Sequence, residues 1–245
     1  MIKLFKKVLK RIFFYPHHQV PVDGYTGLNK IDRKLLDEIN PQRSGYFVEL
    51  GANDGMQQSN TYKLQRSYGW SGLLIEPSPY KFHLCIKNRS FGTTPEFKCC
   101  ACVDSDYPNK YVEMHYRDLM SIANDLDVSA NNMIEHISRA EAHVEDPRLS
   151  YVFGAPARTL TSLLDEVKAP EFFDLLSIDV EGNELSVLKG LNFSKYKPKW
   201  ILVEVRNKSL LISELLLENG YIMKSVLHQS DDYSDVLFVY RDLSL

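Results

Sequence analysis

The residues best suited to chemistry follow a short apolar run near position 50. The run Tyr46–Leu50 leads into residues 51–55, where two glycines flank Asn53 and Asp54. Glycine lets a backbone approach a ligand closely, and the polar groups of such a turn face whatever lies over the edge of a sheet. The pattern is not the GxGxxG dinucleotide fingerprint, and its acid would repel a pyrophosphate. The segment therefore favours a cationic ligand.

Carboxylates also close later apolar runs. Glu76 ends the second run, a position at which α/β proteins commonly hold a ribose diol with one acidic side chain. An ionised carboxylate suits this role because it only accepts hydrogen bonds, and the two hydroxyls donate them. A glutamate at a strand end is by itself more often a solvated terminus, but the glycine loop upstream favours the ligand role. Asp179 and Glu204 lie at or near the ends of two further runs.

These positions depend on an alternation of strand-like and helix-like segments from residue 46 onward. The expected strands span 46–50, 72–76, 97–103, 174–179, 200–205 and 236–240, and the expected helices 60–68, 79–87, 184–189 and 210–218. The strands are apolar without polar alternation, which is typical of a sheet covered on both faces. The sequence therefore predicts an α/β fold, a doubly wound, Rossmann-like and mostly parallel sheet of about seven strands.

Residues 104–157 break this alternation. The segment is polar, rich in Asn, His, Asp and Tyr, and too long for an ordinary connection, with one helix expected around 130–142. Insertions over the carboxyl ends of strands are where α/β enzymes build substrate lids, so we expect a lid here. Its tyrosines that would stack on a sugar ring are Tyr107, Tyr111, Tyr116 and Tyr151.

The first fifteen residues have a composition of their own. Five Lys and Arg side chains are interleaved with apolar residues that share one helical face, and no acid interrupts them. Such a basic amphipathic helix either lies on an anionic membrane surface or packs on the domain with its lysines in water. We expect residues 1–24 to form this helix and a linker, and residues 25–245 to form the main domain.

Composition excludes several classes of protein. The chain has 245 residues, with 29 Lys and Arg against 32 Asp and Glu, and a net charge of −3 gives no drive toward nucleic acid. No apolar run reaches the roughly 18 residues of a membrane-spanning helix. The four cysteines show neither zinc-ligand spacing nor a disulfide framework. We therefore predict a cytoplasmic protein without a nucleic-acid partner, with peripheral membrane contact through residues 1–15 as the open alternative.

Four blocks of the sequence together resemble the FkbM family of methyltransferases. They lie at 49–55 with 59–61, at 70–77, at 178–184 and at 187–190, in the family's order. The family is similar to the class I methyltransferases, which use S-adenosylmethionine, and it mostly methylates hydroxyl oxygens. The resemblance therefore implies an S-adenosylmethionine-dependent O-methyltransferase whose acceptor is a sugar, another glycan or a small natural product.

The resemblance also implies the residues that contact the cofactor. These are Glu49, Gly51, Asn53, Asp54, Gly55, Asn60, Glu76 and Asp104. Within this set the loop after the first strand would line the methionine and ribose portions, Glu76 would bind the ribose hydroxyls, and Asp104 would receive the adenine amino group. Asp179 would face both the cofactor and the acceptor.

Methyl transfer to an alcohol requires in-line geometry and removal of the hydroxyl proton. Asp179 or a histidine of the insertion, His115, His136 or His143, would take this proton. The alternative is a Mg²⁺ ion bound by Asp179 and Glu204, which would lower the pKa of the hydroxyl instead. Both routes stay open at this point.

Two other functions compete with methyl transfer. An NAD-linked oxidoreductase would share the fold, but the chain lacks the glycines that bind its phosphates. A catalytically silent methyltransferase fold could serve as a binding or membrane-tethered module. Against this, the glycine loop, Glu76 and Asp179 are all present.

Overall fold

A computed structural model of the chain describes residues 21, 23–116, 122–123, 151–206 and 209–241. The basic helix expected at 1–15, the helix expected around 130–142 and the candidate bases His136 and His143 lie outside these ranges. The predictions that depend on them therefore stay predictions. Among the described residues, every helix is too short or too polar to cross a membrane.

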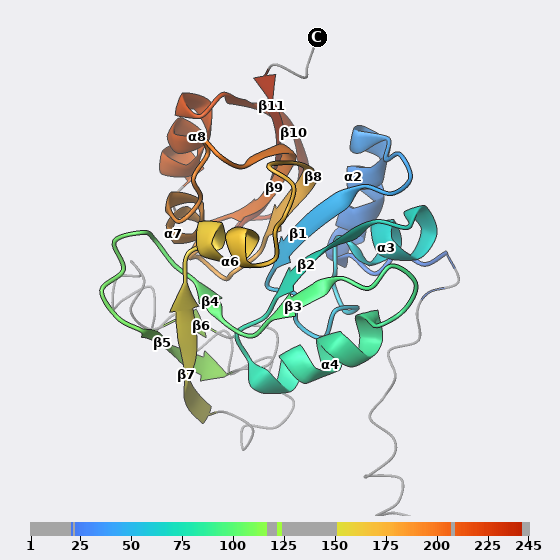
Figure 1. Ribbon diagram of the computed structural model, residues 1–245. Helices are drawn as coiled ribbons and strands as arrows, with labels where there is room; N and C mark the ends of the chain where they lie inside the picture. Colours follow the sequence, from blue (N-terminus) through green and yellow to red (C-terminus); the bar gives the residue numbers. More distant parts are fainter. Residues whose placement is uncertain (1–20, 22, 117–121, 124–150, 207–208, 242–245) are drawn as a thin grey trace, which may run out of the picture.

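A seven-stranded sheet forms the centre of the molecule, in the order β10-β11-β9-β8-β1-β2-β3 (Figure 1). The strands are β1 Tyr46–Leu50, β2 Ser71–Ile75, β3 Glu96–Lys98, β8 Phe172–Ile178, β9 Lys197–Val205, β10 Tyr221–Gln229 and β11 Ser234–Tyr240. Neighbours from β3 to β9 pair in parallel, whereas β11 runs antiparallel to both β9 and β10. The carboxyl ends of five strands therefore meet at one edge, and the predicted fold class is confirmed.

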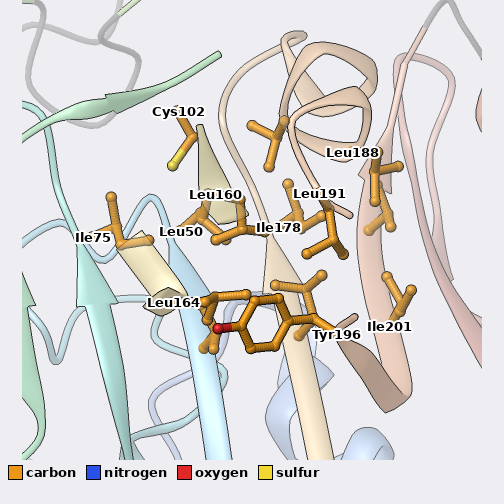
Figure 2. Close-up of a cluster of buried hydrophobic side chains, with 14 of the residues drawn as sticks. Leu50, Ile75, Cys102, Leu160, Leu164, Ile178, Leu188, Leu191, Tyr196 and Ile201 are labelled. Carbon is orange, nitrogen blue, oxygen red and sulfur yellow. The ribbon is translucent and has the colours of Figure 1, made fainter. Parts of the chain in front are cut away.

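Helices cover both faces of this sheet (Figure 1). On one face lie α2 Ile31–Ile39, preceded by the short 3₁₀ helix Leu28–Lys30, α3 Tyr62–Tyr68 and α4 Pro79–Arg89, and on the other α6 Leu160–Glu166, α7 Glu184–Lys189 and α8 Ser209–Glu218. Side chains alternate between the faces along each strand. On β1, Val48 and Leu50 pack with α6 and α7, as Figure 2 shows for Leu50, whereas Phe47 packs with α2 and α3.

A second sheet combines strands from the segment that interrupts the alternation with one strand that directly precedes it. Its order is β4-β7-β5-β6, formed by β4 Ala101–Cys102, β5 Tyr111–Tyr116, β6 Ile122–Ala123 and β7 Tyr151–Arg158. The strand expected over 97–103 is wrong in this respect, because it divides into β3 and β4, which belong to different sheets. The division follows from pairing: β3 pairs with β2, while β4 pairs with β7.

Candidate functional site

A pocket opens at the carboxyl edge of the central sheet. It encloses about 890 Å³ of space, with the open solvent at its mouth included. Of the residues predicted from the sequence, four line it: Gly51, Asn53, Glu76 and Asp179. The other lining residues are Leu50, Gln57, Gln58, Ile75, Pro77, Cys100, Ala101, Cys102, Met114, Val180, Glu181 and Asn183. The strand ends β1, β2 and β8 thus bring the central candidates together.

Gly51 is where the ends of β1 and β8 touch. Its φ is +77°, and a Cβ atom built on it would lie 1.8 Å from the backbone oxygen of Asp179. The amide of Asp179 also donates a hydrogen bond to the carbonyl of Leu50, at 3.3 Å. A glycine is therefore required, both for the left-handed backbone and for the close approach of the two chains.

Glu76 is a buried carboxylate that organises the loop beside it. Its Oε2 accepts a hydrogen bond from the amide of Asn53 and its Oε1 accepts one from the amide of Ser78, both at 2.8 Å. Burial raises the pKa of Glu76 to about 7, although the two hydrogen bonds oppose that shift. Each carboxylate oxygen keeps further acceptor capacity, so the side chain can also take two hydroxyl donors.

Two amide side chains in the pocket are polar and buried without partners. Both Oδ1 and Nδ2 of Asn53, and Oδ1 of Asn183, form no hydrogen bond with the described residues. Buried polar groups in native proteins are rarely left unpaired. Asn53 also adopts a left-handed backbone, with φ of 49°. A polar ligand in the pocket would supply the missing partners, and this observation supports a bound cofactor.

Asp179 lies in a group of acids around one arginine. Burial and the nearby Glu204 raise the pKa of Asp179 to about 8, while Arg206 opposes the shift. The guanidinium of Arg206 lies 2.9 Å from Glu181 and 2.7 Å from Glu204. Glu181 lines the pocket at a φ of 57°, which is uncommon for a residue with a side chain. A carboxylate with a pKa near neutrality can accept a proton.

Glu49 and Asn60 do not line the pocket, contrary to the prediction from the sequence. Alternation along β1 places Glu49 on the face of Phe47, toward α3 and α4. There its carboxylate accepts hydrogen bonds from the amide of Asn60 at 2.8 Å and the hydroxyl of Thr61 at 2.6 Å. The buried Arg89 lies 3.5 Å away. Both predicted residues therefore hold the start of α3 in place.

Asp54 and Gly55 shape the loop without lining the pocket. Oδ1 of Asp54 accepts hydrogen bonds from the amides of Met56, at 2.9 Å, and Gln57, at 2.7 Å. The carbonyl of Gly55 accepts one from Nη1 of Arg89, at 2.9 Å. These contacts satisfy the backbone of the loop from behind, so the two residues act on the pocket through their neighbours.

Three further predicted residues stand apart from the pocket lining. Asp104 lies 3.8 Å from Lys189, and His115, one position beyond Met114 on β5, lies 3.4 Å from Glu113. Glu204 is engaged by Arg206. The described residues contain no group of three or more His, Cys, Asp and Glu side chains that could hold a metal ion. The arrangement therefore gives no support to Mg²⁺ binding by Asp179 and Glu204.

Sequence reasoning missed an apolar wall of the pocket. Cys100, Ala101 and Cys102 belong to the segment that follows β3, and Met114 comes from β5. Cys100 and Cys102 lie near the end of the strand expected at 97–103, so the same reasoning about strand ends could have found them. Met114 carries no such signal, because only the pairing of β5 with β7 brings it to the pocket.

Comparisons with known proteins identify one family model and several solved structures that are similar to this chain. The model of the methyltransferase FkbM domain matches residues 49–223. The structure of a methyltransferase FkbM from Methylobacillus flagellatus KT is similar to this chain, with 17% sequence identity and a TM-score of 0.48. The similar region covers 80% of this chain and 44% of the length of the Methylobacillus protein. Comparison with curated proteins gave no significant match.

Two solved structures with bound ligands are also similar to this chain. M. capricolum TrmK in complex with S-adenosyl-homocysteine is 11% identical over 92% of this chain and 70% of its own, with a TM-score of 0.47. A Streptococcus pneumoniae protein described as a tRNA (m1A22) methyltransferase, in complex with S-adenosyl-L-methionine, is 9% identical over 89% of this chain and 75% of its own, with a TM-score of 0.47.

The family match spans well over half of the chain and includes the glycine loop, Glu76 and Asp179. This chain belongs to the FkbM family of methyltransferase domains.

Proposed function

We propose that this protein transfers a methyl group from S-adenosylmethionine to a hydroxyl of a sugar or a natural product. One observation carries the proposal: a single pocket holds Glu76 and Asp179, two buried acids with raised pKa values, beside the loop at Gly51. Family membership supports methyl transfer, and the chemistry of the pocket supports the choice of cofactor and acceptor.

The donor groups of the pocket fit the cofactor. Glu76 has acceptor capacity for the two ribose hydroxyls, and the unpartnered amide of Asn53 can both donate and accept. The apolar wall at Ala101, Cys102 and Met114 suits the faces of an aromatic base. When bound, S-adenosylmethionine supplies an electrophilic methyl group on a positively charged sulfur, which the surrounding acids stabilise.

Asp179 is the group we assign to remove the hydroxyl proton. A neutral alcohol is a poor nucleophile, so a base must take its proton as the new bond forms. A pKa of about 8 lets the Asp179 carboxylate accept that proton more readily than an exposed aspartate would. Arg206 and Glu204, held 2.7 Å apart, keep the charge around Asp179 in a fixed arrangement.

Isothermal titration calorimetry with S-adenosylmethionine and S-adenosylhomocysteine tests the cofactor. We expect saturable binding that the substitution Glu76→Ala weakens by about 2 kcal/mol, or roughly 30-fold, because hydrogen bonds to a charged group are lost. Glu171→Ala is the matched control, since Glu171 is exposed just before β8, at the other end of the same sheet. A Glu76→Ala affinity within threefold of the wild type would remove Glu76 from the site.

A second assay addresses the acceptor. Methyl-labelled S-adenosylmethionine is incubated with a panel of glycosides, and the products are separated and identified by mass. Label found on oxygen supports the proposal, and label found only on nitrogen or carbon contradicts O-methylation. Protein that binds no cofactor at all would instead favour a binding module that has lost catalysis.

A further inference from the structure

The segment that follows β8 forms a wall of the pocket that is lined by hydrogen-bond acceptors. Glu181 and Asn183 both line the pocket there. Asn183 is 5% exposed and stands directly before α7, but its side chain makes no cap hydrogen bond to that helix. Its Oδ1 is also without a partner among the described residues. A buried acceptor that serves neither the helix nor a neighbour is therefore left for a donor on a ligand.

Glu181 is held in a backbone conformation that residues with a side chain rarely adopt. Its φ is 57°, and that of the following Gly182 is 103°. A left-handed glutamate costs free energy, and strained residues of this kind persist where their surroundings fix them. The amide of Gly182 donates a hydrogen bond to Oε1 of Glu184 at 2.9 Å, which fixes the turn from within. Nη2 of Arg206 lies 2.9 Å from Oε2 of Glu181, so that side chain is fixed as well, and its Oε1 can accept a hydrogen bond from a ligand.

Arg206 is itself held by side chains from three parts of the chain. Its Nε donates a hydrogen bond to Oε1 of Glu204 at 2.8 Å, and its guanidinium carbon lies 5.4 Å from the centroid of the Tyr233 ring. The hydroxyl of Tyr233 accepts a hydrogen bond from Nδ2 of Asn29 at 3.2 Å. Arg206 does not line the pocket. It therefore reaches a ligand through the acid that it holds, Glu181.

The order of the strands indicates which part of the cofactor reaches this wall. Along the carboxyl edge, β2 lies between β3 and β1, and β8 lies beyond β1. In the proposed function the ribose binds Glu76 at the end of β2, and the base packs on the apolar wall at Ala101 and Cys102, which follows β3. The amino-acid chain then extends in the opposite direction, past Gly51 toward β8. Neighbouring strands are about 4.8 Å apart, so this chain has about 10 Å to cross from β2 to β8, and its free end carries an ammonium group.

We propose that Glu181 and Asn183 bind the ammonium group at the end of the cofactor's amino-acid chain, and that Arg206 is the positioning residue that holds Glu181 in place for it. The inference rests on the proposed function and gives roles to residues that the ribose and the base leave unused. An ammonium group has three donors and a positive charge, so it can satisfy the acceptors of both side chains at once. Burial and the neighbouring Asp179 raise the pKa of Glu181, whereas a bound cation would lower it, which favours a positively charged ligand at this wall.

The test removes the ammonium group from the ligand as well as its partners from the protein. Isothermal titration calorimetry compares S-adenosylhomocysteine with its deamino analogue, in which hydrogen replaces the amino group and the carboxylate is kept. We expect the wild-type chain to bind the deamino analogue about tenfold more weakly. Glu181→Gln and Asn183→Ala should each weaken the binding of S-adenosylhomocysteine by about tenfold and leave that of the analogue within about twofold, which also shows that the variants are folded.

Further variants test the role of Arg206. Arg206→Met should weaken the binding of S-adenosylhomocysteine about fivefold, because Glu181 loses the group that fixes it, and Arg206→Lys, which can still pair with Glu181, should recover most of that loss. In the Glu181→Gln background, Arg206→Met should cause less than about a further twofold loss, since two changes that act through one contact are not additive. Lys195→Met is the matched control: it breaks an ion pair of 2.7 Å with Asp165, just before β9 and outside the pocket lining, and should leave the affinity unchanged.

The outcomes also separate this inference from the proposed function. Equal losses for both ligands in Glu181→Gln and Asn183→Ala, or equal binding of both ligands by the wild type, would overturn the ammonium site while the cofactor assignment stands. Additive losses in the double variant, or an undiminished affinity in Arg206→Met, would overturn the positioning role of Arg206. If the wild type binds neither ligand, the proposed function fails, and the inference that rests on it fails with it.

Discussion

The contact between Gly51 and Asp179 makes a sharp prediction for the substitution Gly51→Ala. The new Cβ atom would lie 1.8 Å from the backbone oxygen of Asp179, whereas real Cβ atoms essentially never approach another atom within 3.0 Å. The backbones of the loop and of the end of β8 must therefore separate by about 1.2 Å. A displacement of about 1 Å in a catalytic site can cost roughly 100-fold in rate, so we expect a loss of that size in methyl transfer, together with a weaker affinity for S-adenosylhomocysteine.

Gly69→Ala separates this clash from the cost of the backbone conformation. Gly69 ends α3 with a φ of +69°, close to that of Gly51, but nothing lies within 4 Å of the Cβ atom that would be added. Both variants should lose about 1 kcal/mol of unfolding free energy for the left-handed conformation, and only Gly51→Ala should lose more than that. Calorimetry measures the affinity of each variant, and urea denaturation its stability. Wild-type affinity for S-adenosylhomocysteine in Gly51→Ala, or an equal loss of that affinity in Gly69→Ala, would refute the reasoning.

Two further predictions concern the acids of the pocket. Asp179→Asn should bind S-adenosylhomocysteine with an affinity within about threefold of the wild type. Its rate of methyl transfer, measured by label incorporation, should fall at least roughly 100-fold because the general base is gone. An undiminished rate would exclude Asp179 as the base. The stability of the ligand-free protein should fall as the pH rises from 5 toward 8. In the folded chain the pKa values of Glu76, Glu184 and Asp179 are raised to about 7, 7 and 8. The folded chain therefore still binds protons that the unfolded chain has already released, and this advantage is lost as the pH rises. Thermal unfolding at constant ionic strength measures this stability, and a melting temperature that rises between pH 5 and pH 8 would contradict the prediction. Glu76→Gln should make stability less dependent on pH, because it removes roughly 3 kcal/mol of the change in unfolding free energy over this interval.

The parts of the fold that the sequence predicted well are those buried on both faces. The strand at 46–50 was predicted at its observed bounds because four of its five residues are buried and apolar character alone marks it. β10 was missed because it is the edge strand, and seven of its nine residues are partly buried or exposed. β5 and β7 were missed for a related reason, because exposed residues such as Tyr111 and Val152 interrupt the alternation of apolar and polar side chains.

The candidate site divides in the same way. Gly51, Glu76 and Asp179 line one pocket because strand ends of a parallel sheet converge, a rule that needs no knowledge of side-chain contacts. Glu49 is absent from the pocket lining, as its position next to Leu50 in a strand already indicates, because neighbours in a strand lie on opposite faces. Met114 could not have been assigned, because its place in the pocket depends on pairing with a strand about forty residues further along the chain.

The order of strands at the far edge of the sheet also has a consequence for how the chain is made. β10 precedes β11 in synthesis, yet its only strand partner in the described sheet is β11, which lies between it and β9. A nascent chain that ends after residue 229 therefore holds β10 without a ladder to join, and β9 keeps one side of its own ladder open. The hydrogen bonds of β9 and β10 at this edge can form only when β11, residues 234–240, has left the ribosome. The three strands therefore join the sheet together, and not one after another as they are synthesised.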